Sequence, residues 1–404
     1  MKKICVATGT RAEYGILKPL IDKIYHSKEC ELQLAVTGMH LSTEFGLTYR
    51  EIEKDGYPIT AKIEMLLSAD TPAGITKSMG VELIGFADYF AVHQPDLVII
   101  LGDRYEMLMV ASAALIARIP IAHIHGGEIT EGAVDEAIRH SITKMSQLHF
   151  VSTEEYRRRV IQMGEQPDTV YNVGALGVEN VKNICLLDRE QLEKEIDFNF
   201  SDKTVLVTFH PVTLEKMTAK EQFSNLLKVL DRHEELRIIF TKANADTDGR
   251  IINEMIDDFS SKNKNRCAAY TSLGQLRYLS AVRQCCAVVG NSSSGIIEVP
   301  SFGIPTVNIG DRQRGRVCAE SVISCGNTIE EIQEALGKAL SDNFREVVQK
   351  MKNPYEGKNT SQRICKILSQ KLQYGIPLKK RFYNLEDEEV SSLFRVRLCS
   401  VKEK

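Results

Sequence analysis

Short runs of β-branched residues alternate with amphipathic stretches from the first residues of this 404-residue chain. Examples are KKICVAT before YGILKPLIDKIYH, and DLVIILG before RYEMLMVASAALIAR. Strand and helix in strict turn indicate βαβ units, and therefore a parallel sheet with helices on both faces. The pattern predicts an α/β fold whose ligands bind beyond the carboxyl ends of the strands.

The alternation weakens near residues 175–200, in the charged stretch DREQLEKEIDFNFSDK, and a second series starts at TVLVTFHP. A chain of this length is typical of two domains. We therefore predict two doubly wound, Rossmann-like domains, 1–180 and 200–373, that face each other across a cleft. Residues 374–404 are predicted to form a charged C-terminal extension.

Composition excludes several partners. Lys and Arg total 51 against 54 Asp and Glu, a net charge of −3, which argues against nucleic acid or an anionic membrane as the main partner. No apolar run is long enough to span a bilayer, and the N-terminus shows no signal-peptide core. The ten cysteines form no CxxC pair. We expect reduced thiols and a cytoplasmic protein.

The first strand leads into TGTRAEYG, which places Arg11 on the turn before the first helix. The segment has neither the GxGxxG of a dinucleotide site nor the GKS or GKT of a P-loop, so no cofactor is predicted. A small, basic turn at a helix N-terminus still suits phosphate. A plain βα turn with a surface arginine is the alternative.

The strongest signal in the second half is VVGNSSSGIIEVP, where a buried strand ends and a helix follows. Ser292, Ser293, Ser294 and Gly295 allow close backbone approach and supply hydroxyls for a diphosphate. Glu298, one turn later, is placed to accept from ribose hydroxyls. A structural serine cap is the alternative reading.

Acidic and imidazole groups cluster after two neighbouring strands. Asp103 and Arg104 follow one strand, His125 and Glu128 follow the next, and Asp135 lies at a helix start. Crowded groups of this kind suit proton transfer, because burial and neighbouring charge move their pKa values toward neutrality. The histidines lack the i, i+4 spacing of a helical zinc motif, and no metal site is predicted.

Other candidates lie in loops of the second half. His210 ends a strand in TFHPVT, and we expect it to contact a diphosphate or assist a leaving group. Asn244, Asp246 and Arg316 follow later strands, near the expected phosphate site. For these residues a solvated surface role is the alternative.

Ten segments together carry a family resemblance that spans nearly the whole chain. In order they are TGTRAEYG, VTGMH, GDRYE, HIHGGE, DEAIRHSITKMS, STEEYRRRVIQMGE, FHPVT, ANAD, GNSSSGIIEVP and NIGDRQRGR. The set resembles the hydrolysing UDP-N-acetylglucosamine 2-epimerases of bacterial sialic acid synthesis. The resemblance implies a GT-B fold, no cofactor, and conversion of UDP-N-acetylglucosamine and water to N-acetylmannosamine and UDP. Anti elimination of UDP would give 2-acetamidoglucal, which water then hydrates.

Roles for individual residues follow from the resemblance. Asp103 and Asp135 match residues expected to transfer protons, and the second base is left open between His125 and Glu128. The non-hydrolysing relatives have glutamate at the position of His125. The residues expected to bind UDP are Arg11, Arg104, His210, Asn244, Asp246, Ser292, Ser293, Ser294, Gly295, Glu298 and Arg316.

Several functions remain open from the sequence. The same hydrolysing reaction on UDP-N,N′-diacetylbacillosamine, for legionaminic acid synthesis, is the main alternative, because no residue reports the groups on sugar C4 or C6. A non-hydrolysing epimerase, a glycosyltransferase and a nucleotide-sugar binding module without turnover are the others. Fold analogy does not separate them. We also expect a homo-oligomer, either a dimer or a tetramer.

Overall fold

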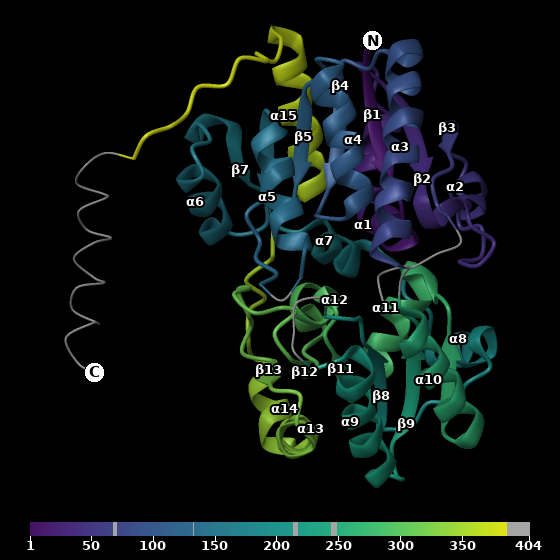
Figure 1. Cartoon of the computed structure of the whole chain (residues 1–404). Helices are drawn as coiled ribbons and strands as arrows, with labels where there is room; N and C mark the ends of the chain where they lie inside the picture. The colour runs from purple at the N-terminus through teal and green to yellow at the C-terminus, as the bar shows by residue number, and fades with distance from the viewer. Residues whose placement is uncertain (68–70, 132, 213–216, 244–248, 386–404) are drawn as a thin grey trace.

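The computed structural model describes residues 1–67, 71–131, 133–212, 217–243 and 249–385. Within these residues the strands form two separate parallel sheets, one in each half of the chain (Figure 1). Helices cover both faces of each sheet, as the alternation of the sequence predicts. The fold is the two-domain, doubly wound α/β arrangement of the GT-B type.

The first sheet has the strand order β3-β2-β1-β4-β5-β6-β7. Every pair of neighbours is parallel, and the order reverses between β1 and β4. The strands are β1 (Lys2–Thr8), β2 (Cys30–Thr37), β3 (Ile59–Ile63), β4 (Leu97–Leu101), β5 (Ile121–Ile124), β6 (Leu148–Val151) and β7 (Val170–Asn172). Their helices are α1 (Arg11–Tyr25), α2 (Tyr49–Lys54), α3 (Pro72–His93), α4 (Tyr105–Ile116), α5 (Asp135–Met145), α6 (Glu154–Gln162) and α7 (Leu176–Asn183).

The second sheet has the order β10-β9-β8-β11-β12-β13 and is also parallel. The strands are β8 (Thr204–Thr208), β9 (Arg237–Thr241), β10 (Cys267–Tyr270), β11 (Ala287–Gly290), β12 (Thr306–Ile309) and β13 (Val322–Cys325). The helices are α8 (Arg189–Ile196), α9 (Ala219–Arg232), α10 (Gly249–Lys262), α11 (Gly274–Gln284), α12 (Ser293–Ile297), α13 (Ile329–Leu340) and α14 (Asp342–Val348). Short 3-10 helices lie at Gly38–Leu41, Pro167–Thr169 and Val299–Phe302.

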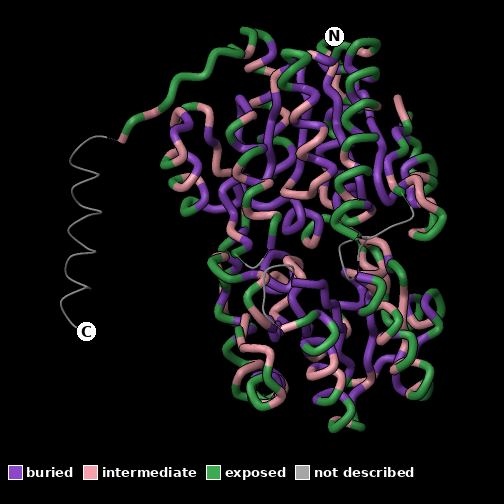
Figure 2. Tube along the Cα trace, viewed as in Figure 1, coloured by how far each residue is buried: buried purple, intermediate pink, exposed green. Residues whose placement is uncertain are grey.

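The central strands of both sheets are among the most buried parts of the two domains (Figure 2). β4 reads Leu-Val-Ile-Ile-Leu and is buried along its whole length, as expected for a central strand covered on both faces. Separate hydrophobic clusters fill the two sides of each sheet. The carboxyl ends of both sheets are left to carry polar side chains.

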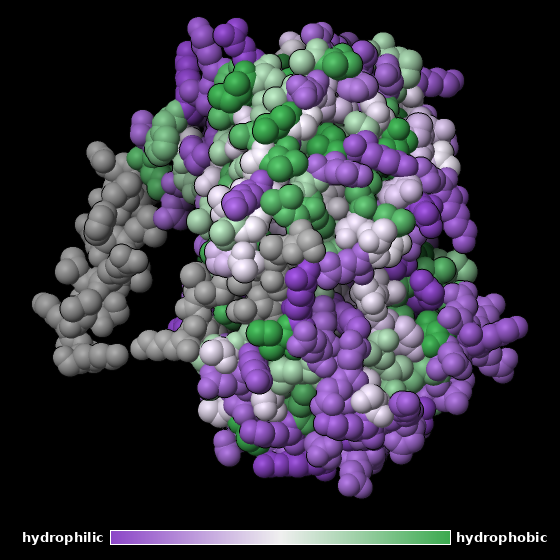
Figure 3. Space-filling view, turned by 45° about the vertical axis from the view of Figure 1, so that its right-hand side comes forward, coloured by the Kyte–Doolittle hydropathy of each residue, from purple (hydrophilic) through white to green (hydrophobic). Residues whose placement is uncertain are grey.

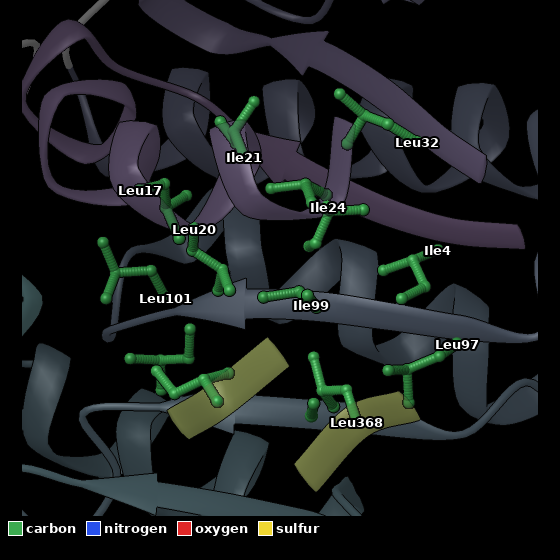
Figure 4. Packing of buried hydrophobic residues seen from close by; sticks show 14 of the residues in the cluster. Ile4, Leu17, Leu20, Ile21, Ile24, Leu32, Leu97, Ile99, Leu101 and Leu368 are labelled. Carbon is green, nitrogen blue, oxygen red and sulfur yellow. The ribbon is translucent and has the colours of Figure 1, made fainter. Parts of the chain in front are cut away.

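The last helix, α15 (Thr360–Tyr374), packs on the first domain and not on the second. Its residues Ile364, Leu368 and Leu372 are buried in the same cluster as β1 and β4. Figure 4 shows Leu368 facing Leu97 and Ile99 of β4. The range 200–373, expected for the second domain, therefore includes a helix that completes the first. The hydrophobic face of α15 fits either sheet by pattern, and its partner is set by where the chain returns.

Among the described residues, no helix combines the length and the apolar character that crossing a bilayer requires.

Candidate active site

A cavity of about 220 Å³ lies between the two domains. Its walls come from α1 and α7 of the first domain, and from strand ends and helix starts of the second. Six residues expected to bind UDP line it: Arg11, His210, Ser292, Ser293, Ser294 and Glu298. The structure thus brings together groups from three segments that are far apart in the sequence.

The serine run is held in place by the end of β11. Gly290 has φ 134°, and a Cβ there would clash with the carbonyl oxygen of Thr208 on β8. The next residue, Asn291, is fully buried, and its side chain bonds the backbone of His210 twice. Its Oδ1 accepts from the His210 N–H at 2.7 Å, and its Nδ2 donates to the His210 carbonyl at 2.8 Å. His210 and the serines therefore share one rigid wall.

The opposite wall begins at α1. Thr10 caps this helix in a capping box with Glu13, whose Oε2 also accepts from the Gly9 N–H at 2.7 Å. Arg11 follows and extends toward the second domain, where it lies so close to Gly274 that no Cβ would fit. Its guanidinium forms an ion pair with Glu51 at 2.7 Å. The turn expected to bind phosphate is thus ordered by the capping box, and it holds the Arg11 guanidinium, paired with Glu51, beside the second domain.

Glu298 lies where the two walls meet. Its carboxylate contacts Gly177 at the start of α7, again without room for a Cβ. Burial raises the pKa of Glu298, although Ser294 and the nearby His125 oppose that shift. A carboxyl group in this environment gains from donors such as vicinal hydroxyls, which would replace its lost hydration.

His125 lies at the carboxyl end of β5 in an unusual backbone conformation, with φ 66°. Its Nδ1 lies 2.8 Å from Oε1 of Glu128, and the carboxylate can only accept, so Nδ1 carries the hydrogen. The buried Nε2 has no hydrogen-bond partner among the described residues. An imidazole oriented by a carboxylate, with its second nitrogen unpaired, is the arrangement used in acid–base catalysis.

Glu128 is engaged on every side. Ser152 donates to Oε1 at 3.0 Å, and Arg316 of the second domain approaches Oε2 at 2.7 Å. Burial opposes ionisation, but Arg316 and His125 outweigh it and lower the pKa of Glu128 to about 2. The side chains of Glu128 and Arg316 are only 2% and 5% exposed, so this is a buried ion pair between domains.

Arg316 is also held by its neighbours. Its Nε donates to the carbonyl of Ile129 at 3.0 Å, which ties the loop after β12 to the loop after β5. Next to it, the Val317 N–H donates to the hydroxyl of Tyr156 at 2.9 Å, and Tyr355 donates to the Val317 carbonyl at 2.8 Å. Arg316 lies outside the wall of the cavity described above, and its guanidinium belongs to the domain junction.

The remaining acid–base candidates surround the start of α5. Asp103 forms an ion pair with Arg139, which is almost fully buried and also donates to Thr130 at 2.8 Å. Asp135 is the first residue of α5 and is half-buried. Arg104 directly precedes α4, and its side chain pairs with the buried Glu106 at 3.1 Å. Asp103 is therefore oriented by an arginine on a neighbouring helix.

Several residues that line the cavity were not predicted from the sequence, and some residues that were predicted to bind UDP do not line it. Further residues lining the cavity are Gly177, Thr208, Thr241, Lys242, Thr271, Ser272, Gly274, Gln275 and Tyr278. The segment TSLGQLRY, which contains five of these residues, could have been recognised from the sequence, because its small and polar residues join a strand to a helix start. Gly295 packs against Thr306 behind the serines. Asn244 and Asp246 lie outside the described residues.

Within the described residues, no group of three or more His, Cys, Asp and Glu side chains is arranged to hold a metal ion.

The buried pair predicts a stability effect that depends on pH. Replacing Glu128 with Gln leaves Arg316 buried without a counter-charge, which costs about 3–5 kcal/mol of unfolding free energy at pH 7. The pKa of Glu128 in the folded protein, about 2, lies below the ordinary value of 4.5. The wild type therefore has the larger free energy of unfolding above pH ~4.5, and this difference from Glu128→Gln is lost as the pH falls toward 2.

Urea denaturation of the wild type and of Glu128→Gln between pH 7 and 3 measures this effect. Glu131→Gln is the matched control, because Glu131 also faces an arginine of the second domain, Arg314 at 3.5 Å, but both groups are exposed. If the two variants lost the same free energy of unfolding at pH 7, the assignment of Glu128 and Arg316 as a buried, stabilising ion pair would be wrong.

Comparisons with known proteins agree with this geometry. Residues 22–369 match the family described as UDP-N-acetylglucosamine 2-epimerase. The chain is 44% identical to the GDP/UDP-N,N′-diacetylbacillosamine 2-epimerase (hydrolyzing) of Campylobacter jejuni, over 85% of this chain and 89% of that protein. It is 39% identical to the polysialic acid biosynthesis protein P7 of Escherichia coli, over 96% and 98% of the two chains.

Solved structures show the same fold. The UDP-GlcNAc 2-epimerase of Neisseria meningitidis, bound to UDP-GlcNAc, aligns with a TM-score of 0.77 at 18% identity, over 92% of this chain and 100% of that one. The predicted family resemblance is confirmed by these matches. The chain belongs to the UDP-N-acetylglucosamine 2-epimerase family, and within it to the hydrolysing UDP-sugar 2-epimerases.

Proposed function

We propose that this protein converts a UDP-2-acetamido sugar and water to UDP and the free sugar inverted at C2. The observation that carries the proposal is the cavity between the domains. It joins serine hydroxyls, His210, Arg11 and Glu298 in one site. The oriented pair of His125 and Glu128 lies beside it, close enough to influence the ionisation of Glu298.

The chemistry explains why such groups are needed. The hydrogen on C2 of the sugar is not acidic in the substrate. Departure of UDP gives C1 oxocarbenium character, which makes that hydrogen labile, and its removal by a base gives 2-acetamidoglucal. Return of a proton to C2 on the other face, with addition of water at C1, gives the free epimer. Two acid–base groups on opposite faces of the ring are required.

The UDP end of the substrate fits the second domain. We assign the diphosphate to the hydroxyls of Ser292, Ser293 and Ser294, with the charge of Arg11 approaching from the other domain. Glu298 is assigned to the ribose hydroxyls. His210, fixed by Asn291, is placed to donate to the leaving diphosphate. Asn244 and Asp246 remain predictions.

The acid–base groups belong to the first domain. We assign one role to His125, because its Nε2 is unpaired while Glu128 is saturated by three partners and orients the ring. The other role is assigned to Asp103, which Arg139 holds in place, with Asp135 nearby on α5. Of His125 and Glu128, the two candidates that the sequence left open, we therefore propose His125.

Two substrates are supported by the names of relatives. The 44% identical relative is named as acting on GDP/UDP-N,N′-diacetylbacillosamine, and we place this sugar nucleotide first. UDP-N-acetylglucosamine, the original expectation, is supported by the 39% identical polysialic acid biosynthesis protein, because N-acetylmannosamine is a precursor of sialic acid.

Steady-state rates with both sugar nucleotides separate these readings. We expect the enzyme to release UDP and free sugar from UDP-N,N′-diacetylbacillosamine, with a kcat/KM at least about tenfold higher than for UDP-N-acetylglucosamine. The opposite preference would assign the protein to N-acetylmannosamine formation. If neither compound is turned over, the proposed reaction is wrong. A nucleotide-sugar binding module and a glycosyltransferase would then be the functions left to test.

Replacing His125 tests the acid–base assignment. His125→Gln keeps a hydrogen-bond donor toward Glu128 but cannot move a proton. We expect kcat to fall by about 10²–10⁴-fold, the range for loss of an acid–base group, with the Kd for UDP changed less than threefold. His26→Gln, an exposed histidine on the far end of α1, is the control. A kcat within threefold of the wild type would refute the role of His125.

We also propose a homo-oligomer built on the outer face of α3 and α4. Several large aliphatic side chains are exposed there: Val81, Leu83, Ile84, Val92, Leu115 and Ile116. Figure 3 shows hydrophobic residues gathered over the upper, first domain, whereas the second is mostly hydrophilic. A group of exposed aliphatic side chains on one face favours contact with a second copy of the chain, and an isologous dimer is the commonest arrangement.

Sedimentation velocity measures this state. We expect a species of at least twice 45.3 kDa that dissociates in the variant Ile84→Glu/Ile116→Glu. A wild-type monomer at micromolar concentration would refute it.

The nine described cysteines are all free, which supports a reducing compartment such as the cytoplasm.

A further inference from the structure

The chain that follows α15 crosses the first domain and contacts α5 and the loop after α6 (Figure 1). We call residues 380–383 the C-terminal strap. The Tyr383 N–H donates to the carbonyl of Gly164 at 2.8 Å, and Gln166 donates to the carbonyl of Arg381 at 3.2 Å. These backbone contacts fix the path of the strap over the loop.

Two side chains of the strap hold it further. The ring of Phe382 lies against Gly164, which has φ 88° and no room for a Cβ, and the ammonium of Lys144 lies 5.1 Å from the same ring. Lys380 points the other way, into the domain. Its side chain is 26% exposed although it belongs to a surface segment.

Lys380 uses its ammonium group completely. It donates to the carbonyl oxygens of Lys144 at 2.8 Å and Ser146 at 2.6 Å, and it pairs with Glu165 at 2.6 Å. An ammonium has three N–H donors, so three acceptors satisfy it. Both carbonyls belong to the C-terminal end of α5, where helix carbonyls lack partners and a cation is favoured by the helix dipole.

Glu165 carries the contact deeper into the domain. Its Oε2 lies 3.0 Å from Nε2 of His149 on β6, and both side chains are buried. His149 is the register partner of His123 on β5. His123 contacts the carbonyl of Gly102 at 2.7 Å, directly before Asp103. Buried polar side chains on neighbouring strands therefore lie between the strap and the loop that carries Asp103, with the two histidines adjacent in register but not hydrogen-bonded to each other.

The helix provides a second connection to the same place. α5 is anchored at its C-terminal end by Lys380, and its first turns carry Asp135 and Arg139. Arg139 in turn pairs with Asp103. The helix thus runs from Lys380 to the acid–base groups, the two histidines lie on the neighbouring strands, and none of these residues lines the cavity that we assign to UDP.

We propose that Lys380 is a positioning residue, which holds α5 and the loop after β4 so that Asp103 and Asp135 are aligned for proton transfer. This inference rests on the proposed function. It gives the C-terminal extension a role in catalysis without contact with substrate. A role in folding alone is the competing explanation, and it makes a different kinetic prediction.

The test uses full-length Lys380→Met, Lys380→Arg and the matched control Lys379→Met, whose lysine is exposed beside the strap. Loss of alignment should lower kcat of Lys380→Met by about tenfold, since small misplacements of catalytic groups have large effects. KM and the Kd for UDP should stay within twofold. Lys380→Arg, which keeps the charge and several donors, should recover at least half of the lost kcat.

Hydrogen exchange supplies the second readout. In Lys380→Met, amides of the last turns of α5 should exchange faster than in Lys379→Met, while those of α12 remain unchanged. If Lys380→Met does not fold, Phe382→Ala loosens the strap from its exposed side and should lower kcat in the same selective way.

A kcat for Lys380→Met equal to that of Lys379→Met would overturn the proposal. So would an equal loss of kcat and UDP binding that follows the folded fraction, because that is the signature of a folding role. Absence of turnover in the wild type with either UDP-sugar would instead be a failure of the proposed function, and is therefore distinguishable.

Discussion

The buried ion pair between Glu128 and Arg316 is the interaction on which the site depends. It joins the loop after β5 to the loop after β12, and both partners are almost fully removed from water. Such a pair depends on further hydrogen bonds that offset the lost hydration of both charges. Ser152 and His125 contact the carboxylate, and the carbonyl of Ile129 accepts from Nε of Arg316. The same carboxylate that fixes the domains therefore fixes the ring of His125.

The two domains contribute different groups to the site. The second domain presents the serine run and His210 on one rigid wall, because Gly290 and Asn291 leave that turn little freedom. The first domain presents imidazole and carboxylate groups at the ends of β4 and β5. A reaction that begins with departure of UDP and continues at sugar C2 needs both sets close together, with the charged groups partly shielded from water.

Much of this arrangement was predictable from sequence. Strand and helix alternation predicts the fold class, and the rule that ligands bind at the carboxyl ends of parallel strands points to the serine run, His210 and Arg11, which line one cavity in the structure. The site roles were harder to assign, because Glu128 and Arg316 are far apart in the chain and nothing local shows that they pair. Each looked like an independent functional residue, one a base and the other a UDP ligand.

Two further features escaped prediction for similar reasons. The face of α15 is apolar in a way that fits any sheet, so its return to the first domain follows only from the three-dimensional path. Lys380 lies in a charged stretch that is typical of solvated surface, yet its ammonium reaches three acceptors. Contacts between distant segments are decided by packing, which local sequence patterns do not report.

The most direct test of the central claim is deuterium incorporation at sugar C2 during turnover in heavy water, followed by proton NMR. Elimination and hydration through acid–base groups of the first domain predict that each released sugar carries one deuterium at C2, formed together with one UDP. Released sugar that keeps its original hydrogen at C2 would exclude removal and return of the proton by two separate groups on opposite faces, and would contradict this account of the site.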